Sequence, residues 1–397
     1  MNETLFSKRN AAIDMLRGLT MLLMVFVNDF WSIGGVPHFL EHFGTYEDGM
    51  GVSDVVFPMF LFAMGMSIPY ALERRFAKGC PGESTLGHIL SRTLALVLMG
   101  VFIVNTEGGF DSTLGYSKGF YRVLMVTAFF LIWNTYPAGM RGKMWLQALG
   151  AAVLAFLAFT FRTPEGGYFK AGWWGILGLI GWAYCFCAVA YLLARKRPVY
   201  LLATWVILLI VNMLLTGLRD GGRIIEGASF IGDMAGALRL GNASSAIMAM
   251  GGVLLSLAER KLQDKSAAVR AGSALAVSAV LAVAAAISHN WWIVSKDIGT
   301  LPWCLYVSAL SIVVYTLLRS LEACGRTGWF RPLSPAGTAT LTVYMMPYLL
   351  YSVCGFIGLH TPQWLSGVPG LLKCALFSLL CVWITGLLGK AGLKLKI

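Results

Sequence analysis

Two histidines and several carboxylates share one short polar stretch between long apolar runs. The stretch is "PHFLEHFGTYEDG", residues 37–49, and it contains His38, Glu41 and His42. A histidine of ordinary pKa, about 6.5, exchanges protons near neutral pH, and a neighbouring carboxylate can orient its ring. The stretch is therefore a candidate for acid–base or nucleophilic chemistry, and an inert polar loop is the alternative.

Polar residues at the ends of the two flanking apolar runs could meet this stretch. Asn28 lies at the end of the preceding run, where a polar side chain usually hydrogen-bonds a neighbouring helix. Asp54 lies in the first turn of the next predicted helix, where the helix dipole favours a carboxylate. Pro58 offers no N–H to the carbonyl of Asp54, so we expect a kink or a loose helix start. Ala63 and Ser67, with Gly65 between them, permit close approach of another helix. We expect Asn28 and Asp54 to lie near one vestibule with His42.

Two further polar elements are candidates for ligand contacts. The segment "SHNWWIVSKDIGTLPW", residues 288–303, contains Lys296 and Asp297, which could contact a substrate or form a salt bridge with each other. In the first apolar run, Asp14 and Arg17 are three residues apart and share one helical face. Their alternatives are an interfacial ion pair and a site at which Arg17 holds an anionic ligand.

The elements that must position these residues are membrane helices. Fifty-seven per cent of the 397 residues are hydrophobic and 13% are charged, whereas a soluble domain carries about 25% charged residues. Apolar runs near the roughly 20 residues that cross a bilayer recur along the chain. We therefore predict an all-α, polytopic transmembrane helix bundle in one domain, 1–397, with about twelve spans and eleven as the alternative. The runs are 13–30, 55–72, 93–106, 123–140, 144–161, 171–194, 198–218, 240–258, 271–295, 298–318 and 332–372, which holds two spans.

The positions of the basic residues predict the orientation of these spans. Most of the 31 Lys and Arg residues fall in alternate loops, and cytoplasmic loops collect such residues. Both termini are therefore expected in the cytoplasm, and residues 37–49 on the opposite face. These basic residues, which keep their loops in the cytoplasm, also explain the net charge of +12. Nucleic-acid binding would need a soluble domain with a basic face, and we expect neither such a domain nor a nucleic-acid partner.

Two segments resemble a known enzyme family. The stretch "AIDMLRGLTMLLMVFVND", followed by "LEHFGTYEDGMGVSDVVFPMFLFAMGMSI", resembles the N-terminal signature of the heparan-α-glucosaminide N-acetyltransferase family, in its bacterial branch. That signature is Asp-x-x-Arg-Gly, an apolar run ending in Val-Asn, a histidine in the next loop, and Asp-(Leu/Val)-Val-Phe-Pro. The later "SKDIGTLPW" resembles the family's Lys-Asn-Leu-Trp-Thr segment, although Asp297, Ile298 and Gly299 replace Asn-Leu-Trp.

The resemblance implies an enzyme that moves acetyl from cytosolic acetyl-CoA to an amine, such as an amino sugar, across the membrane. It assigns the catalytic histidine to His42 and its partner asparagine to Asn28. The stretch between Asn28 and Asp54 is longer here than in the family, so His38 is a second candidate for the catalytic histidine. The histidine would act as a general base or form an acetyl-histidine. Asp54 or Glu41 would orient it, and Asn28 would donate to the oxyanion.

The remaining groups would bind the two substrates. Arginine suits phosphate groups, so the cytoplasmic arginines would bind the CoA phosphates; these are Arg17, Arg74 and Arg75. The acceptor, a small-molecule or glycan amine, would meet His38, Glu41, Lys296 and Asp297. The chemistry needs no metal, and the family implies a possible homodimer in a bacterial inner membrane. The rival functions are an O-acyltransferase of cell-envelope glycans, a secondary transporter and a structural or partner-binding protein.

Overall fold

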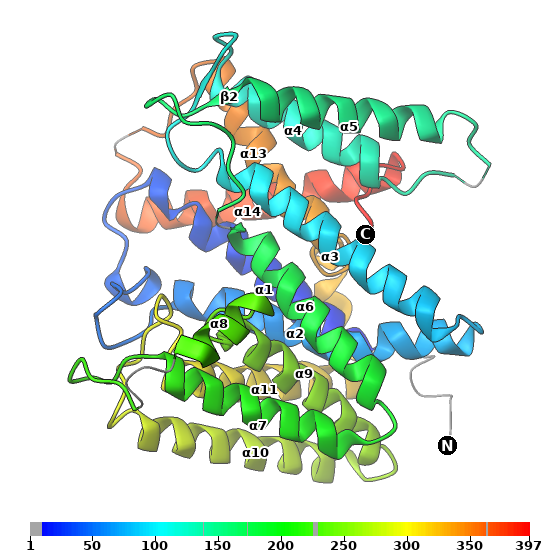
Figure 1. Ribbon diagram of the computed structural model, residues 1–397, viewed down its shortest axis with the longest axis vertical. Coiled ribbons are helices and arrows are strands. Elements are labelled where there is room, and N and C mark those ends of the chain that lie inside the picture. The colour runs from blue at the N-terminus through cyan, green and yellow to red at the C-terminus, as the bar shows by residue number, and fades with distance from the viewer. Residues whose placement is uncertain (1–9, 138, 173, 225–228, 363) are drawn as a thin grey trace. The chain divides into compact units, whose positions relative to one another are not determined.

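The computed structural model describes residues 10–137, 139–172, 174–224, 229–362 and 364–397 (Figure 1). It confirms the prediction of an all-α protein, because the only strands among these residues are two of two residues each. The helices are α1 (Ala11–Asn28), α2 (Val52–Ala77), α3 (Gly82–Val104), α4 (Lys118–Trp133), α5 (Lys143–Thr160), α6 (Gly175–Ala194), α7 (Pro198–Leu215), α8 (Ser229–Ala237), α9 (Ser244–Lys261), α10 (Ala267–Ser288), α11 (Leu301–Ala323), α12 (Ser334–Thr338), α13 (Thr340–Phe356) and α14 (Gly367–Lys390). The strands are β1 (Asp111–Ser112) and β2 (Phe161–Arg162), and short 3₁₀ turns span Phe30–Ser32, His38–Leu40 and Gly328–Phe330.

The helices follow the apolar runs of the sequence. Within the described ranges, nine helices are long and apolar enough to cross a membrane: α1, α2, α3, α5, α6, α7, α10, α11 and α14. The protein is therefore a polytopic membrane protein, as predicted. Helices α4, α9 and α13 occupy the other predicted runs. The number of twelve spans and the cytoplasmic termini stay predictions, and residues 1–9 lie outside the described residues.

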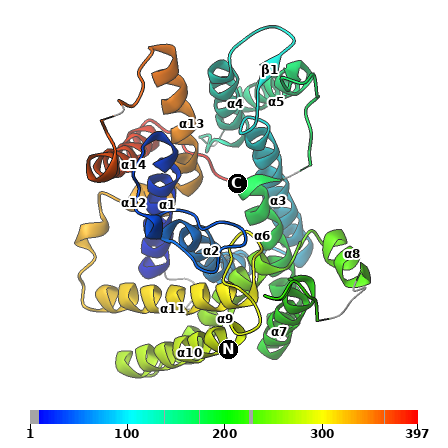
Figure 2. The ribbon, with the colours of Figure 1, turned by 90° about the vertical axis from the view of Figure 1, so that its left-hand side faces the viewer.

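Contacts divide the chain into two compact units. The two polar segments 37–49 and 288–303 both belong to the first unit. This unit comprises Met1–Thr20, Pro37–Leu90 and Trp182–Arg331. Helices α2 and α11 are its most buried spans, whereas few residues of α7 and α10 are buried, as in a lipid-facing helix. Helices α10 and α11 pack side by side (Figures 1 and 2), so the loop between them is held at the end of a packed helix pair.

Small residues bring α2 and α9 into close contact. A Cβ atom on Gly65 would lie 1.8 Å from the carbonyl oxygen of Ala249, and one on Gly252 would lie 2.0 Å from that of Phe62. Only glycine fits both positions, which confirms the predicted close approach at Gly65. The buried hydroxyl of Ser256 donates to the carbonyl of Met66 at 2.9 Å. This packing fixes α2, whose first turn carries Asp54.

The second unit comprises Met21–Val36, Ser91–Gly181 and Pro332–Ile397. Helix α4 packs against α5 and α13, and α13 packs against α14. The strands β1 and β2 pair antiparallel, with Asp111 opposite Arg162. The prediction of a single domain over 1–397 is not tested by this division and stays a prediction.

A buried ion pair lies in the second unit, just after α1. Asp29 is fully buried, and its carboxylate accepts Lys373 Nζ at 2.8 and 3.0 Å. The hydroxyls of Tyr351 and Ser32 donate to the same carboxylate at 2.8 and 3.1 Å. Because a lysine and two hydroxyls contact this carboxylate, its charge is compensated within the apolar bundle.

Candidate active site around His42

A histidine and a buried carboxylate form the centre of the site. His42 Nδ1 lies 2.7 Å from Asp54 Oδ1. The side chain of Asp54 is only 2% exposed, and its Oδ2 accepts the backbone N–H groups of Phe43 and Gly51, each at 3.0 Å. Three donors therefore hold this carboxylate ionised and oriented. The structure brings together two of the predicted catalytic residues.

The local sequence explains why the loop closes back on the start of α2. Gly51 precedes the helix in an extended conformation, and Asp54, its third residue, accepts the Gly51 N–H as in a capping box. A Cβ on Gly51 would lie 2.0 Å from the carbonyl oxygen of Glu41, so this contact requires glycine. Ser53 also donates its hydroxyl to the carbonyl of Leu40 at 2.6 Å. These contacts set the position of His42, which directly follows Glu41.

The proline in the second turn of α2 frees a backbone carbonyl near the site. Pro58 cannot donate to the carbonyl of Asp54, and the indole N–H of Trp303 donates to it at 3.3 Å instead. Helix α2 begins at Val52 and continues through Pro58. The helix start is therefore regular, because Trp303 of α11 supplies the missing donor, and the alternative of a kink at Pro58 stays a prediction.

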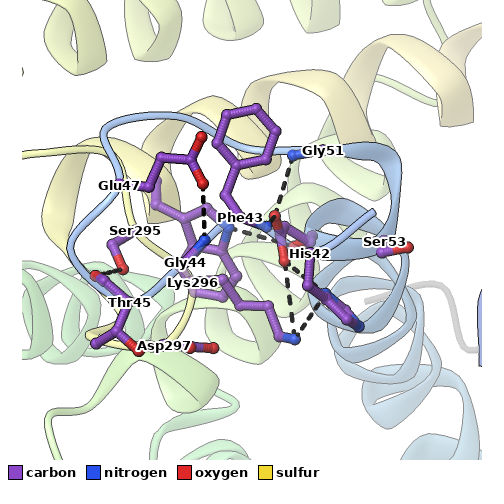
Figure 3. Close-up of polar contacts among 12 residues, drawn as sticks. His42, Phe43, Gly44, Thr45, Glu47, Gly51, Ser53, Ser295, Lys296 and Asp297 are labelled. Carbon is purple, nitrogen blue, oxygen red and sulfur yellow. Dashed lines mark hydrogen bonds and ion pairs between the residues drawn. The ribbon is translucent and has the colours of Figure 1, made fainter. Parts of the chain in front are cut away.

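Lys296 is the third charged member of the centre. Its Nζ lies 3.1 Å from His42 Nδ1 and 3.8 Å from Asp54 Oδ1 (Figure 3). Burial lowers the pKa of Lys296, and the charges of Asp54 and Asp297 oppose that shift only in part. The ion pair that Lys296 forms is with Asp54. The alternative of a loop salt bridge with Asp297 is not what the structure has.

Asp297 instead joins the two loops. Its Oδ2 accepts the hydroxyl of Thr45 at 2.9 Å, and the hydroxyl of Ser295 donates to the carbonyl of Thr45 at 2.8 Å. The N–H of Gly49 donates to the carbonyl of Val294 at 2.9 Å. The loop before α2 and the loop before α11 are therefore joined by several hydrogen bonds, which hold Lys296 beside the imidazole of His42.

One ring nitrogen of His42 remains available for chemistry. Its Nδ1 faces Asp54 and Lys296, whereas its Nε2 makes no hydrogen bond with the described residues, and the side chain is 48% exposed. Of the two partners of Nδ1, the Asp54 carboxylate is closer, at 2.7 Å against 3.1 Å for Lys296 Nζ, and it favours the tautomer in which Nδ1 carries the proton and Nε2 the lone pair. In this tautomer Nδ1 accepts no hydrogen bond from Lys296, whose ammonium group pairs with Asp54. The imidazole is thus arranged to take a proton, or to attack as a nucleophile, through Nε2.

The other members of the polar stretch have different surroundings. His38 Nε2 lies 2.7 Å from Glu47 Oε1 in an exposed pair. The N–H of Gly44 and the neighbouring His38 lower the pKa of Glu47. The exposed carboxylate of Glu41 contacts no described donor. Of the two histidines, only His42 has a buried carboxylate partner, and that partner is not Glu41.

Asn28, the remaining predicted catalytic residue, belongs to the second unit. It is the last residue of α1 and is exposed. Its predicted place beside His42 stays a prediction. The adjacent Asp29 is buried, and the sequence analysis did not select it. The feature that could have indicated it is a charged residue directly after an apolar run.

The three predicted phosphate ligands belong to the first unit. Arg17 lies 3.5 Å from Asp14 and 3.4 Å from the hydroxyl of Ser67, which confirms the predicted Asp14–Arg17 pair. In the last turn of α2, Arg75 donates to the carbonyl of Ser84 at 3.2 Å, and Arg74 is exposed. These guanidinium groups fit an anionic ligand chemically. In the described part of the chain, no three His, Cys, Asp or Glu side chains are grouped to hold a metal ion.

Comparison with known proteins confirms the resemblance drawn from the two motifs. A family model described as "Domain of unknown function (DUF5009)" matches residues 9–224, more than half of the chain. Heparan-alpha-glucosaminide N-acetyltransferase of Mus musculus is 38% identical over 99 residues, which are 25% of this chain and 14% of the mouse protein. The Homo sapiens protein of the same name is 37% identical over 97 residues, 24% of this chain and 14% of the human protein. The match thus spans about one seventh of the length of these relatives.

Proposed function

The chain belongs to the family described as Domain of unknown function (DUF5009), and we propose that it is a transmembrane acetyltransferase. It moves acetyl from cytosolic acetyl-CoA to an amine at the opposite face of a bacterial inner membrane. The observation that carries the proposal is the contact of His42 Nδ1 with the buried Asp54 at 2.7 Å, with Nε2 left free. The similarity to two N-acetyltransferases supports the reaction class.

His42 supplies the proton transfer that the reaction needs. The donor contributes an activated thioester carbonyl. As the amine nitrogen forms its bond to the carbonyl carbon, His42 Nε2 takes the amine proton. Asp54 stabilises the resulting imidazolium from the Nδ1 side. When the carbon–sulfur bond breaks, the same proton passes to the leaving sulfur.

A two-step route uses the same arrangement. Here Nε2 of His42 attacks the thioester and carries the acetyl group before the amine accepts it. Asp54 again orients the ring and balances its positive charge. In both routes Lys296 is a positioning residue, because its ammonium group, close to Asp54 Oδ1 and His42 Nδ1, fixes the charge balance around the pair. Asn28 would donate to the oxyanion.

The rest of the proposal concerns the ligands and the topology. Arg17, Arg74 and Arg75 would bind the phosphates of the donor, as their charge allows. An amino sugar, free or in a glycan, is the proposed acceptor, and it would meet the polar groups of the two loops that carry His42 and Lys296: His38, Glu41, Lys296 and Asp297. Twelve spans with both termini in the cytoplasm put the donor and the acceptor on opposite faces, and a homodimer is the proposed assembly.

A hydroxyl acceptor is the second candidate, because an oriented Asp–His pair also activates hydroxyl groups. Glucosamine presents both nucleophiles, so mass spectrometry of the product separates amide from ester. Transport is less well supported, since the charged groups of the His42 centre lie at helix ends and in loops, whereas transporters place them near the midplane.

Acetyl transfer from labelled acetyl-CoA to glucosamine by the purified protein tests the proposal. We expect transfer by the wild type and by His38→Ala, and its loss in His42→Ala. Label that stays on the wild-type protein when the acceptor is omitted, and is absent from His42→Ala, would support the acetyl-histidine route. Absence of acetyl-CoA binding would overturn the proposal. Binding without transfer to glucosamine would overturn the amino-sugar acceptor.

A further inference from the structure

A second polar cluster lies in the first unit and is not used by the proposed reaction. Asp48 Oδ1 lies 2.7 Å from His289 Nε2, and Asp48 Oδ2 lies 2.7 Å from Arg219 Nη2. Arg219 Nη2 also donates to the carbonyl of His289 at 3.0 Å. His289 directly follows α10, and Arg219 follows α7 by four residues. The cluster therefore joins the ends of two helices in which few residues are buried.

Beside this cluster the surface is hollowed. An open pocket of about 380 Å³ is lined by Arg219, Ala286, His289 and Asn290. One terminal nitrogen of Arg219 is used by Asp48, which leaves the other donors of its planar group for a ligand, and the side chain is 46% exposed. The Nδ1 atom of His289 is on the opposite side of the ring from Asp48. The pocket thus offers the remaining N–H groups of the Arg219 guanidinium, together with its charge.

Asp48 keeps Arg219 and His289 in place. Burial disfavours its charge, but the N–H of Val294 at 2.8 Å and His289 outweigh that cost and lower the pKa of Asp48. The carboxylate is therefore ionised at neutral pH. It holds Arg219 and His289 on the same wall, so a ligand does not have to order them.

An apolar stripe leads to the pocket along α10. Val280, Val283, Ile287 and Trp291 are 67%, 59%, 54% and 54% exposed. The three residues Val280, Val283 and Ile287 are spaced by three and four positions and share one face of α10, and Trp291 lies three residues beyond its last residue, Ser288. In a bilayer, exposed apolar residues of this kind contact acyl chains, and tryptophan marks the level of the headgroups. Ile287 and Trp291 are sequence neighbours of Ala286 and Asn290, so the polar pocket lies where the lipid-facing stripe ends.

We propose that this pocket binds the phosphate of a glycerophospholipid, whose acyl chains lie along the α10 stripe. Arginine matches phosphate in charge and planar geometry, and a polar pocket at the end of a lipid-facing helix is placed for a headgroup. Free phosphate esters share this chemistry, and only the lipid also uses the stripe. The proposal goes beyond acetyl transfer and does not depend on it.

The bound lipid would also brace the candidate active site. Asp48 lies six residues after His42 in the same loop, and its backbone neighbour Gly49 bonds Val294, two residues before Lys296. A ligand that fixes Arg219 and His289 fixes Asp48, and with it both loops. We therefore expect lipid binding to raise the thermal stability of the protein.

Binding of three probes to the full-length protein in a neutral maltoside detergent tests the proposal. The probes are dioctanoyl phosphatidylglycerol, dioctanoylglycerol, which lacks phosphate, and glycerol 3-phosphate, which lacks chains. Native mass spectrometry and the thermal unfolding temperature are the readouts. We expect only the phospholipid to bind and to stabilise the protein.

Three variants locate the binding. Arg219→Gln removes the charge and should weaken phospholipid binding by roughly tenfold or more. Ala286→Leu fills the pocket from an exposed helical position, leaves the Arg219–Asp48 pair intact, and should have the same effect. Arg223→Gln is the matched control, since it removes an equal charge from an exposed residue in the same loop, and binding should persist.

Each of three results would overturn the proposal. Undiminished phospholipid binding by Ala286→Leu would mean that the pocket is not the site. Equal loss in Arg223→Gln would indicate attraction by the overall charge of the loop. Equal affinity for glycerol 3-phosphate would assign the pocket to a soluble phosphate ester. If Arg219→Gln fails to fold, Ala286→Leu decides alone.

Discussion

The indole N–H of Trp303 donates to the backbone carbonyl of Asp54 at 3.3 Å, which is the carbonyl that Pro58 leaves without its helical donor. Trp303 is 4% exposed, so no water replaces it easily. The residue that carries the candidate orienting carboxylate is thus held at its backbone by α11 and at its side chain by the loop before α2. This contact satisfies the carbonyl that Pro58 leaves free, and helix α2 is regular from Val52 onward.

Trp303→Phe is expected to destabilise the protein by about 1–3 kcal/mol through the unsatisfied buried carbonyl, in addition to the lost packing. Pro58→Ala restores an N–H four residues after Asp54, so it should recover part of the loss in the Trp303→Phe background. Denaturation by SDS titration from mixed micelles measures both. Equal effects of Pro58→Ala on the wild type and on Trp303→Phe would contradict the coupling.

Asp54→Asn should lower the turnover of acetyl transfer strongly, by about 10²–10⁴-fold, because the amide no longer favours the Nδ1–H tautomer of His42. The asparagine oxygen can still accept the N–H groups of Phe43 and Gly51, so the fold should persist. Transfer rates at saturating acetyl-CoA are the measurement. Glu47→Gln, which removes the charge beside His38, is the matched control and should retain most activity. A full rate in Asp54→Asn would exclude the orienting role.

The helices were predictable because an isolated apolar run can cross a bilayer in only one kind of secondary structure. A segment of about 20 apolar residues must satisfy its backbone internally, which makes it a helix. The closeness of His42 and Asp54 was also predictable, since twelve residues that return to a helix start leave little freedom. The small size of Gly65 was enough to predict a close helix contact. The sequence did not indicate that the contact would be with Ala249.

The long-range partners were not predictable from local sequence. Lys296 is adjacent to Asp297 in the chain, yet it pairs with Asp54, more than two hundred residues earlier. Which of two carboxylates a lysine meets depends on how the loops before α2 and α11 lie, and no periodicity encodes that. Arg219 and Asp48 are a second such pair. The choice of Glu41 or Asp54 as the orienting carboxylate needed the fold for the same reason.

Lys296 should react with an amine-directed reagent at lower pH than a lysine in an unstructured peptide, whose pKa is about 10.4. Burial lowers the pKa of Lys296, and the charge of Asp54 raises it. Asp54→Asn should therefore move the labelling midpoint to still lower pH. Peptide mass spectrometry after labelling at a series of pH values reads both shifts.

The same shift has a consequence for stability. A lysine whose pKa is lower in the folded protein makes folding bind fewer protons, so stability rises as the pH rises through the folded pKa toward the unfolded one. Lys296→Met should reduce this rise between neutral pH and about pH 10. A labelling midpoint for Lys296 at or above that of the unstructured peptide would contradict both expectations.

Lys373→Met should destabilise the protein by about 3–5 kcal/mol, because it leaves the carboxylate of Asp29 buried without its cation. Asp29 is fully buried, and Lys373 contacts both of its oxygens. The hydroxyls of Tyr351 and Ser32 remain as donors, but neither carries a charge. SDS titration of the purified protein measures the loss.

The double variant Asp29→Asn/Lys373→Met separates the cost of an uncompensated charge from the value of the pair. An amide in place of the carboxylate removes the charge, and the two hydroxyls can still bond its oxygen, so the double variant should be more stable than Lys373→Met alone. Lys170→Met, on an exposed lysine of the same unit, controls for the substitution and should change stability by less than about 0.5 kcal/mol. If the double variant is as unstable as Lys373→Met, the lysine stabilises the second unit through the packing of its aliphatic chain, and the buried charge of Asp29 is not what makes its loss costly.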